Sequence, residues 1–265
     1  MLETLPEILR HARQATRLSQ HTLSLRINVS QRHVSFVESG RARPSRQLLL
    51  TWLAELDAPL HVRNAALVTA GYAPVYSAAP LTDPSLAAAR RAIGRLLEAH
   101  DPLPAFVLDP LWNLVSTNLG GRWLAATLVP WTAELTPETP VNLLDLLVHP
   151  EGLAARIVNL PAVGPELLAH LRADAAAHPA LTPRVEAFAA MLTARGVDHR
   201  SVAAGQRPLA PVLTTHYATA FGELAFFSMF TTFGTPHDIT LASLRVEHLF
   251  AADDFTRAVL TAQVA

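Results

Sequence analysis

The residues of this 265-residue chain that could perform acid–base or metal chemistry are 12 histidines and 22 carboxylates, because it contains neither cysteine nor lysine. That absence excludes thiolate zinc sites, Walker-type phosphate binding and Schiff-base catalysis. No HxxxH or HExxH spacing groups the histidines, and no GxSxG motif supplies a serine nucleophile. His237 and Asp238 form a candidate dyad, but their surroundings have the pattern of a turn in which Asp238 caps the next helix. We therefore predict no catalytic residues and no metal site.

Composition and charge suggest a two-part protein. A chain of this length suits one small and one medium domain. Each apolar run is short and interrupted by charge or proline, and the first residues lack a secretory signal, so we expect no membrane partner and a cytoplasmic location. Residues 1–71 carry nine arginines against five acids, whereas residues 72–265 carry twelve against seventeen. A basic first part suits contact with a polyanion.

The spacing of apolar residues predicts five short helices in residues 1–71. Ser19 and Ser30 have the pattern of N-caps for the second and third helices. Asn28 stands between these helices, where a tight turn needs a residue that tolerates left-handed backbone. Gly40 ends the third helix, whose inward face is Val34 and Val37.

The segment LSQHTLSLRINVSQRHVSFVESGRARPS, Leu18 to Ser45, resembles the Cro- and repressor-type helix-turn-helix domain. The resemblance implies an all-α five-helix domain that binds a double-stranded DNA operator, with its third helix in the major groove. Arg13 and Glu38 match a structural pair of this fold, and Phe36 could equally serve packing. The predicted base readers are Ser30, Gln31, Arg32, Ser35 and Phe36. The predicted backbone contacts are Gln20, Arg41 and Arg43.

Beyond a linker at 72–84, residues 85–265 have the pattern of an α+β domain with an antiparallel sheet and flanking helices. The run from Leu224 to Phe230 is too apolar for a half-exposed strand, so we expect both faces to be covered by helices, a ligand or a second subunit. Helices are predicted at 85–100, 118–128, 142–147, 151–158, 164–177 and 183–194. Strands are predicted at 105–109, 112–117, 212–219, 223–231 and 244–250.

Nearly the whole chain resembles the MmyB-like regulators, in which a repressor-type domain precedes a PAS-like ligand-binding and dimerisation domain. The resemblance rests on RARPS, GYAP, AHDPLPAFVLD–WNLVSTN, HPEG and TTFGTPHDITLASLRVEHLFAADDFT. It implies an apolar, fatty-acid-like ligand and no other cofactor. Leu160 departs from the tryptophan expected after Asn159. The predicted ligand-binding residues are Phe106, Trp112, Phe226, Phe227 and Phe230 as lining, with His149, Arg156 or His216 meeting a carboxylate. Each aromatic could instead belong to the core.

Together these patterns predict a sequence-specific, homodimeric DNA-binding transcription regulator whose second domain senses a small apolar ligand. The alternative is a regulator whose second domain is a ligand-free dimerisation or partner-docking module. A third hypothesis, an enzyme, requires serine, histidine and aspartate clustered in a cleft.

Overall fold

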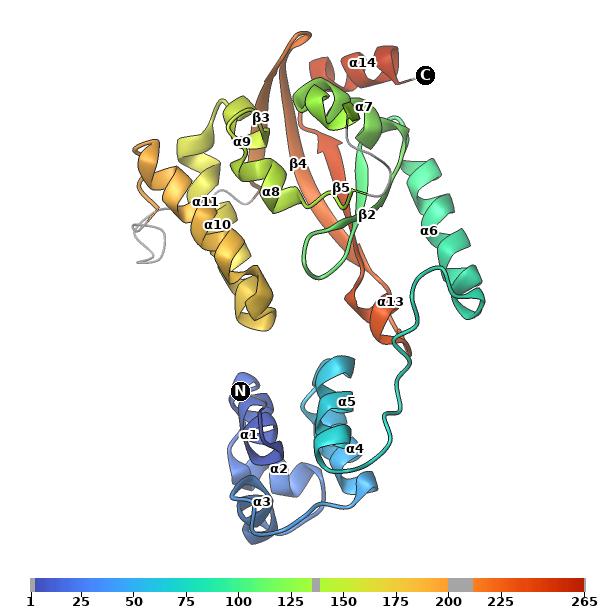
Figure 1. The fold of residues 1–265 in the computed structure, drawn as a ribbon, viewed down its shortest axis with the longest axis vertical. Helices are drawn as coiled ribbons and strands as arrows, with labels where there is room; N and C mark the ends of the chain where they lie inside the picture. Colours follow the sequence, from blue (N-terminus) through green and yellow to red (C-terminus); the bar gives the residue numbers. More distant parts are fainter. Residues whose placement is uncertain (1–2, 135–138, 200–211, 265) are drawn as a thin grey trace. The chain divides into compact units, whose positions relative to one another are not determined.

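The computed structural model describes residues 3–134, 139–199 and 212–264. The chain divides into two compact units (Figure 1). The first unit contains residues 1–86 together with 234–242, and the second contains 87–233 and 243–265. The first unit therefore includes a short segment from late in the sequence.

Five helices build most of the first unit, as the sequence predicts. Ser19, Ser30 and Ser45 each accept a hydrogen bond from a backbone N–H of the helix that follows. Asn28 adopts a left-handed conformation with φ of 54°, which confirms the predicted turn between the second and third helices. The helices are α1 (Leu5–Ala15), α2 (Gln20–Arg26), α3 (Gln31–Glu38), α4 (Arg46–Glu55) and α5 (Leu60–Thr69).

One apolar core joins these five helices. Trp52 of α4 is fully buried at its centre, and Val34 and Val37 present the predicted inward face of α3 to it. Burial of such side chains is the main favourable term in the folding of a small helical domain. The core therefore fixes α3 so that its other face remains accessible.

The segment after α5 is held in place by hydrogen bonds. The Asn64 side chain pairs with the backbone of Val75 and Tyr76. Further on, the backbone N–H of Ile239 donates to the Ser77 carbonyl at 2.7 Å, and the Thr240 hydroxyl donates to the Ala79 carbonyl at 2.7 Å. Asp238 accepts from the Thr240 N–H at 2.8 Å and caps α13 (Ile239–Ser243), which confirms its predicted capping role.

The second unit is built on a five-stranded sheet in which every strand pair is antiparallel. This confirms the predicted α+β class. The strand order is β2-β1-β5-β4-β3, so β5 is central. The strands are β1 (Ala105–Leu108), β2 (Leu114–Thr117), β3 (Thr214–Thr219), β4 (Gly222–Thr232) and β5 (Arg245–Ala251).

Helices cover both faces of this sheet (Figure 1). The layer α8–α11 shares an apolar core with one face, which includes Leu108. On the other face, His100 at the end of α6 contacts the rings of His248 and Phe250. The helices are α6 (Ala87–His100), α7 (Leu119–Leu128), α8 (Leu143–Val148), α9 (Leu153–Arg156), α10 (Leu160–Ala177), α11 (Thr182–Ala194) and α14 (Asp254–Gln263). No described helix is long and apolar enough to cross a membrane.

Several details of this unit differ from the sequence predictions, and among them α10 begins at Leu160 rather than at residue 164, and α9 is shorter than the predicted 151–158. Trp112 does not begin a strand: it lies in the hairpin turn with φ of 65°, and β2 begins at Leu114. Helix α14 is additional; its N-cap Asp253 accepts from the Thr256 N–H at 2.7 Å. The β4 run is buried from Leu224 to Phe226 but exposed at Met229 in the single chain, so the expected cover is incomplete there.

Candidate functional site

The accessible face of α3 carries the predicted base readers. Gln31 and Arg32 are exposed in the first turn, after the N-cap Ser30. Ser35 and Phe36, one turn further on, are partly accessible. Side chains three and four positions apart share one face of a helix, so these positions form a continuous surface opposite the buried valines.

Phe36 lies between two arginines on this surface. The Cζ atom of Arg32 is 5.1 Å from the centre of the Phe36 ring, and that of Arg41 is 5.9 Å away. Such cation–π contacts hold the two guanidinium groups beside the ring. Phe36 therefore orients charged neighbours, and its predicted contact with a base stays a prediction.

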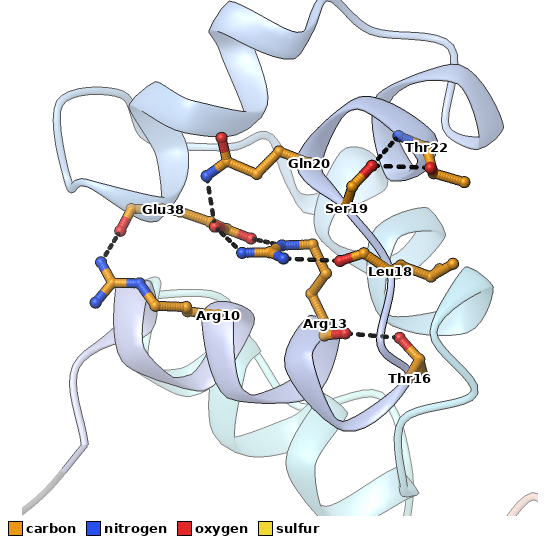
Figure 2. A network of polar contacts seen from close by, with 8 residues as sticks. All are labelled: Arg10, Arg13, Thr16, Leu18, Ser19, Gln20, Thr22 and Glu38. Atoms are coloured by element: carbon orange, nitrogen blue, oxygen red, sulfur yellow. Dashed lines mark hydrogen bonds and ion pairs between the residues drawn. The ribbon is translucent and has the colours of Figure 1, made fainter.

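Glu38, the last residue of α3, connects α1, α2 and α3 through one polar network (Figure 2). Its buried carboxylate accepts from Arg13 Nε at 2.7 Å, from Arg13 Nη2 at 2.8 Å and from Gln20 Nε2 at 2.8 Å. Arg13 also donates to the Leu18 carbonyl, and Arg10 donates to the Glu38 carbonyl, both at 2.8 Å. This confirms the predicted Arg13–Glu38 pair.

The environment of Glu38 favours its charged form. Burial alone would raise its pKa, but hydrogen bonds from Arg13 and Gln20 and the charges of Arg13 and Arg10 outweigh burial and lower the pKa below its usual value. A charged, fully bonded carboxylate fixes α1, α2 and the end of α3 relative to one another. The network thereby orients α3.

The three residues predicted to contact the DNA backbone differ in their surroundings. Gln20 donates one amide N–H to Glu38, although an amide nitrogen carries two. Arg43 donates to the Ala70 carbonyl at the end of α5, and its guanidinium lies over the Tyr72 ring. Arg41 is exposed. Arg43 is exposed as well, so both arginines are accessible to a phosphate.

The second unit contains a cavity of about 610 Å³ between the sheet and the layer α8–α11. Most of its lining is aliphatic or aromatic. Four of the residues predicted from the sequence border it: Trp112, Phe226, Phe227 and Phe230. The ring of Phe227, however, stacks on Phe250, on the opposite sheet face.

The other four predicted ligand residues lie outside this lining. Phe106 packs into the core clusters, and Arg156 is exposed. The ring of His149 packs on Trp131, with 4.3 Å between ring centres. His216 Nδ1 lies 2.6 Å from Glu223 Oε1. The cations expected to meet a carboxylate therefore do not gather at the cavity.

The cavity wall contains polar residues that the sequence reading missed, chiefly Glu247, Tyr217 and Ser228. Burial raises the pKa of Glu247 to about 7, although the charge of Arg245 and a hydrogen bond from Ser228 lower it. Burial, helped by the charge of Glu247, also raises the pKa of Tyr217. Period-two alternation in RVEHLFA was the available signal, because it places Glu247 on the same face as Leu249.

Arg245 stands beside the cavity, and one of its three nitrogens has a hydrogen-bond partner. Its Nη1 donates to Asp174 Oδ2 at 2.8 Å, and Trp112 Nε1 donates to the same oxygen at 2.8 Å. The Arg245 Cζ atom lies 4.1 Å from the centre of the Trp112 ring. Arg245 is therefore paired with Asp174 through Nη1 and stacked on Trp112, while its buried Nε and Nη2 have no hydrogen-bond partner among the described residues.

Among the described residues, no group of three or more histidines and carboxylates could hold a metal ion. The fold and these two sites define a class: DNA-binding regulators with a helix-turn-helix unit and a ligand-binding unit. A family model for the MmyB-like transcription regulator ligand binding domain matches residues 89–262, and a helix-turn-helix model matches residues 9–61. The first match spans well over half of the chain, so the protein belongs to the MmyB-like regulators. No curated protein matches the chain.

Proposed function

We propose that this protein is a sequence-specific transcription regulator that binds an operator as a homodimer and responds to a small apolar ligand. The ligand has a fatty-acid-like apolar body and occupies the cavity beneath α8–α11. The observation that carries the proposal is the apolar cavity of about 610 Å³ in a chain that also presents an accessible α3.

The size and lining of the cavity support this assignment. Pockets for small molecules typically measure about 300–1,000 Å³ and combine apolar walls with a few polar groups. A ligand regulates DNA binding only if it binds the competent and incompetent states with different affinity. The cavity supplies the binding energy from which such a difference arises.

Dimerisation follows from the limited contact that one helix-turn-helix unit makes with DNA. Two linked units reading two half-sites gain affinity through effective concentration. We expect the operator to contain two related half-sites, and sedimentation with and without operator DNA measures the stoichiometry. A single chain bound at saturation would contradict the dimer.

The DNA-binding test replaces Gln31 and Arg32 together by alanine and measures binding to the gene's own upstream region. Each lost base contact should cost about 1–3 kcal/mol on the operator, with little change on unrelated DNA. The matched control replaces Gln14 and Arg91, which are exposed residues outside α3. Unchanged affinity and selectivity in the α3 variant would overturn the assignment of α3 as the reading helix.

The ligand test is native mass spectrometry of the purified protein, followed by thermal shift with decyl compounds. We expect a bound mass or a rise in melting temperature, and Leu167→Trp, which fills the cavity from α10, should abolish both. Leu96→Trp, at an exposed position on α6, should not. An empty protein with no shift would favour the ligand-free dimerisation or docking module.

A further inference from the structure

We propose that the segment 234–242 couples the cavity to the DNA-binding unit, so that a ligand in the cavity changes operator affinity through the hydrogen bonds of Asp238 and Thr240. This inference rests on the proposed function, because it names the device by which the same ligand acts on the same operator. The segment belongs to the first unit, although the strands on both sides of it, β4 and β5, belong to the second.

The strands that flank the segment form part of the cavity wall. Phe230 of β4 and Glu247 of β5 are cross-strand partners, and both border the cavity. Phe230 lies four positions before the segment and Glu247 five positions after it. Thr232, the last residue of β4, pairs with Arg245, the first residue of β5. The segment is therefore the connection of a strand pair that a ligand in the cavity would touch.

Arg245 links the start of β5 to two further parts of the cavity wall. Its Cζ atom lies 4.1 Å from the centre of the Trp112 ring and 5.3 Å from that of Phe230, and both rings border the cavity. Its Nη1 donates to Asp174 of α10, whereas its buried Nε and Nη2 have no hydrogen-bond partner among the described residues. Because few bonds hold the guanidinium in place, a ligand that shifts either ring should also shift the start of β5.

Within the first unit, the segment is bonded to the chain that follows α5. The Ile239 N–H donates to the Ser77 carbonyl and the Thr240 hydroxyl donates to the Ala79 carbonyl, both at 2.7 Å. The carboxylate of Asp238 is buried. One of its oxygens accepts from the Thr240 N–H at 2.8 Å, and the other accepts from the Ala79 N–H at 3.4 Å. These bonds hold the connection of β4 and β5 against the chain after α5.

Residues 75 and 76 continue this path to α5. The Asn64 side chain accepts from the backbone N–H groups of Val75 and Tyr76, at 3.0 and 3.1 Å, and donates to the Tyr76 carbonyl at 2.7 Å. Helix α5 shares one apolar core with α3. A hydrogen-bonded path therefore runs from the segment to the core that positions the DNA-reading helix, and a displacement of the segment is transmitted along it.

The experiment measures the coupling between decanoate and operator DNA in the full chain. Fluorescence anisotropy gives the operator Kd, on the gene's own upstream region, with and without saturating decanoate. We expect decanoate to change the wild-type Kd by about fivefold or more. Thr240→Val and Asp238→Ala should each bring this ratio close to one. Both variants should still bind decanoate, with the thermal shift of the wild-type protein.

Matched controls make the same chemical changes outside the segment. Asp253→Ala removes the N-cap of α14, and Thr261→Val removes a hydroxyl that donates to the Arg257 carbonyl at 2.9 Å. Both controls should keep the wild-type ratio. A ratio close to one in the controls as well would overturn the proposal, because the effect would then not belong to the segment.

Hydrogen exchange gives a second readout that needs neither DNA nor a variant. No described residue in 74–82 or 234–242 borders the cavity. Decanoate should nevertheless change the exchange rates of the Ile239 and Ala79 amides, because both donate hydrogen bonds between these two stretches. Unchanged exchange at both amides, with decanoate bound, would overturn the proposal.

The outcomes separate this inference from the proposed function. If decanoate does not bind the wild-type protein, the ligand-sensing assignment is overturned and the coupling with it. If decanoate binds and changes operator affinity equally in the wild type, Thr240→Val and Asp238→Ala, the ligand-responsive regulator stands and the segment is not its coupling device. If Asp238→Ala does not fold, Thr240→Val and the exchange measurement decide.

Discussion

Each unit contains a glutamate with a shifted pKa, Glu38 buried and Glu247 partly buried, and the surroundings of the two are opposite. Glu38, in the first unit, receives three hydrogen bonds from Arg13 and Gln20. Glu247, in the second, receives a hydrogen bond from Ser228 and no ion pair from the described residues. The pKa of Glu38 lies below the usual value, whereas burial raises that of Glu247 to about 7.

The difference separates a carboxylate whose hydrogen bonds fix helices from one that borders a cavity. Where the fold supplies every donor, an enclosed charge fixes the position of helices. Where the fold leaves the carboxyl beside a cavity with few donors, burial raises its pKa. Arg41 and Arg43 differ on a smaller scale: both are exposed, but Arg43 also donates a hydrogen bond to the Ala70 carbonyl within the fold.

Removing Glu38 should give the largest effect. Glu38→Ala leaves the Arg13 guanidinium without its counter-ion in a mostly buried position, a change that typically costs about 3–5 kcal/mol. Chemical denaturation followed by far-UV circular dichroism measures the loss. The control Glu55→Ala breaks the exposed Arg26–Glu55 pair and should cost less than about 1 kcal/mol. Equal losses would remove the distinction between a structural carboxylate and a surface one.

Glu247 should give the second unit a stability that falls as the pH rises. In the unfolded chain its carboxyl titrates near its usual pKa of 4.5, but in the folded protein it holds its proton to about pH 7. The contribution of Glu247 to the free energy of unfolding is on the order of 3 kcal/mol. It is fully present below pH 4.5 and is lost as the pH rises past 7.

Melting of the ligand-free protein from pH 5 to 8 measures this loss, and Glu247→Gln should reduce it. His248 acts in the opposite direction, because burial and the charge of His100 lower its pKa. The difference between wild type and variant isolates Glu247 from His248. Identical profiles for the wild type and Glu247→Gln would show that Glu247 already has a partner.

The two arginines should give the smallest effects, which differ in kind. Arg41→Ala should weaken binding to all DNA sequences evenly and reduce the salt-dependence slope by about one unit, with stability unchanged. Arg43→Ala should lower stability by about 1 kcal/mol through loss of its bond to the Ala70 carbonyl. Titrations at several salt concentrations and denaturation curves separate these results. A reduced slope in Arg43→Ala alone would reverse the two assignments.

Local signals predicted the first unit well. Ser19, Asn28 and Ser30 act through their own backbone neighbourhood, so their residue types determine caps and turns directly. The Arg13–Glu38 pair joins distant residues and was predicted through the resemblance to repressor-type domains. For the second unit, the predicted fold class and most predicted elements were correct, because its strands and helices follow clear apolar periods.

The cavity was less predictable, because register and packing decide which side chains border it. Phe226 and Phe230 alternate onto the cavity face, whereas the neighbouring Phe227 turns its ring toward Phe250. Arg156, His149 and His216 were selected by charge, and their places along helix ends and an edge strand could not be read from residue type. Glu247 was missed because the alternation of RVEHLFA shows which residues share a face but not which face borders a cavity.

The late-sequence partners of Ser77 and Ala79 matter for biosynthesis. Their hydrogen bonds join residues about 160 positions apart in the chain. At about 5–20 residues per second, a ribosome needs roughly 8–30 s to add that length. The five N-terminal helices therefore leave the ribosome well before the segment around Asp238 that completes their unit, and during this interval Ser77 and Ala79 must satisfy their backbone groups with water.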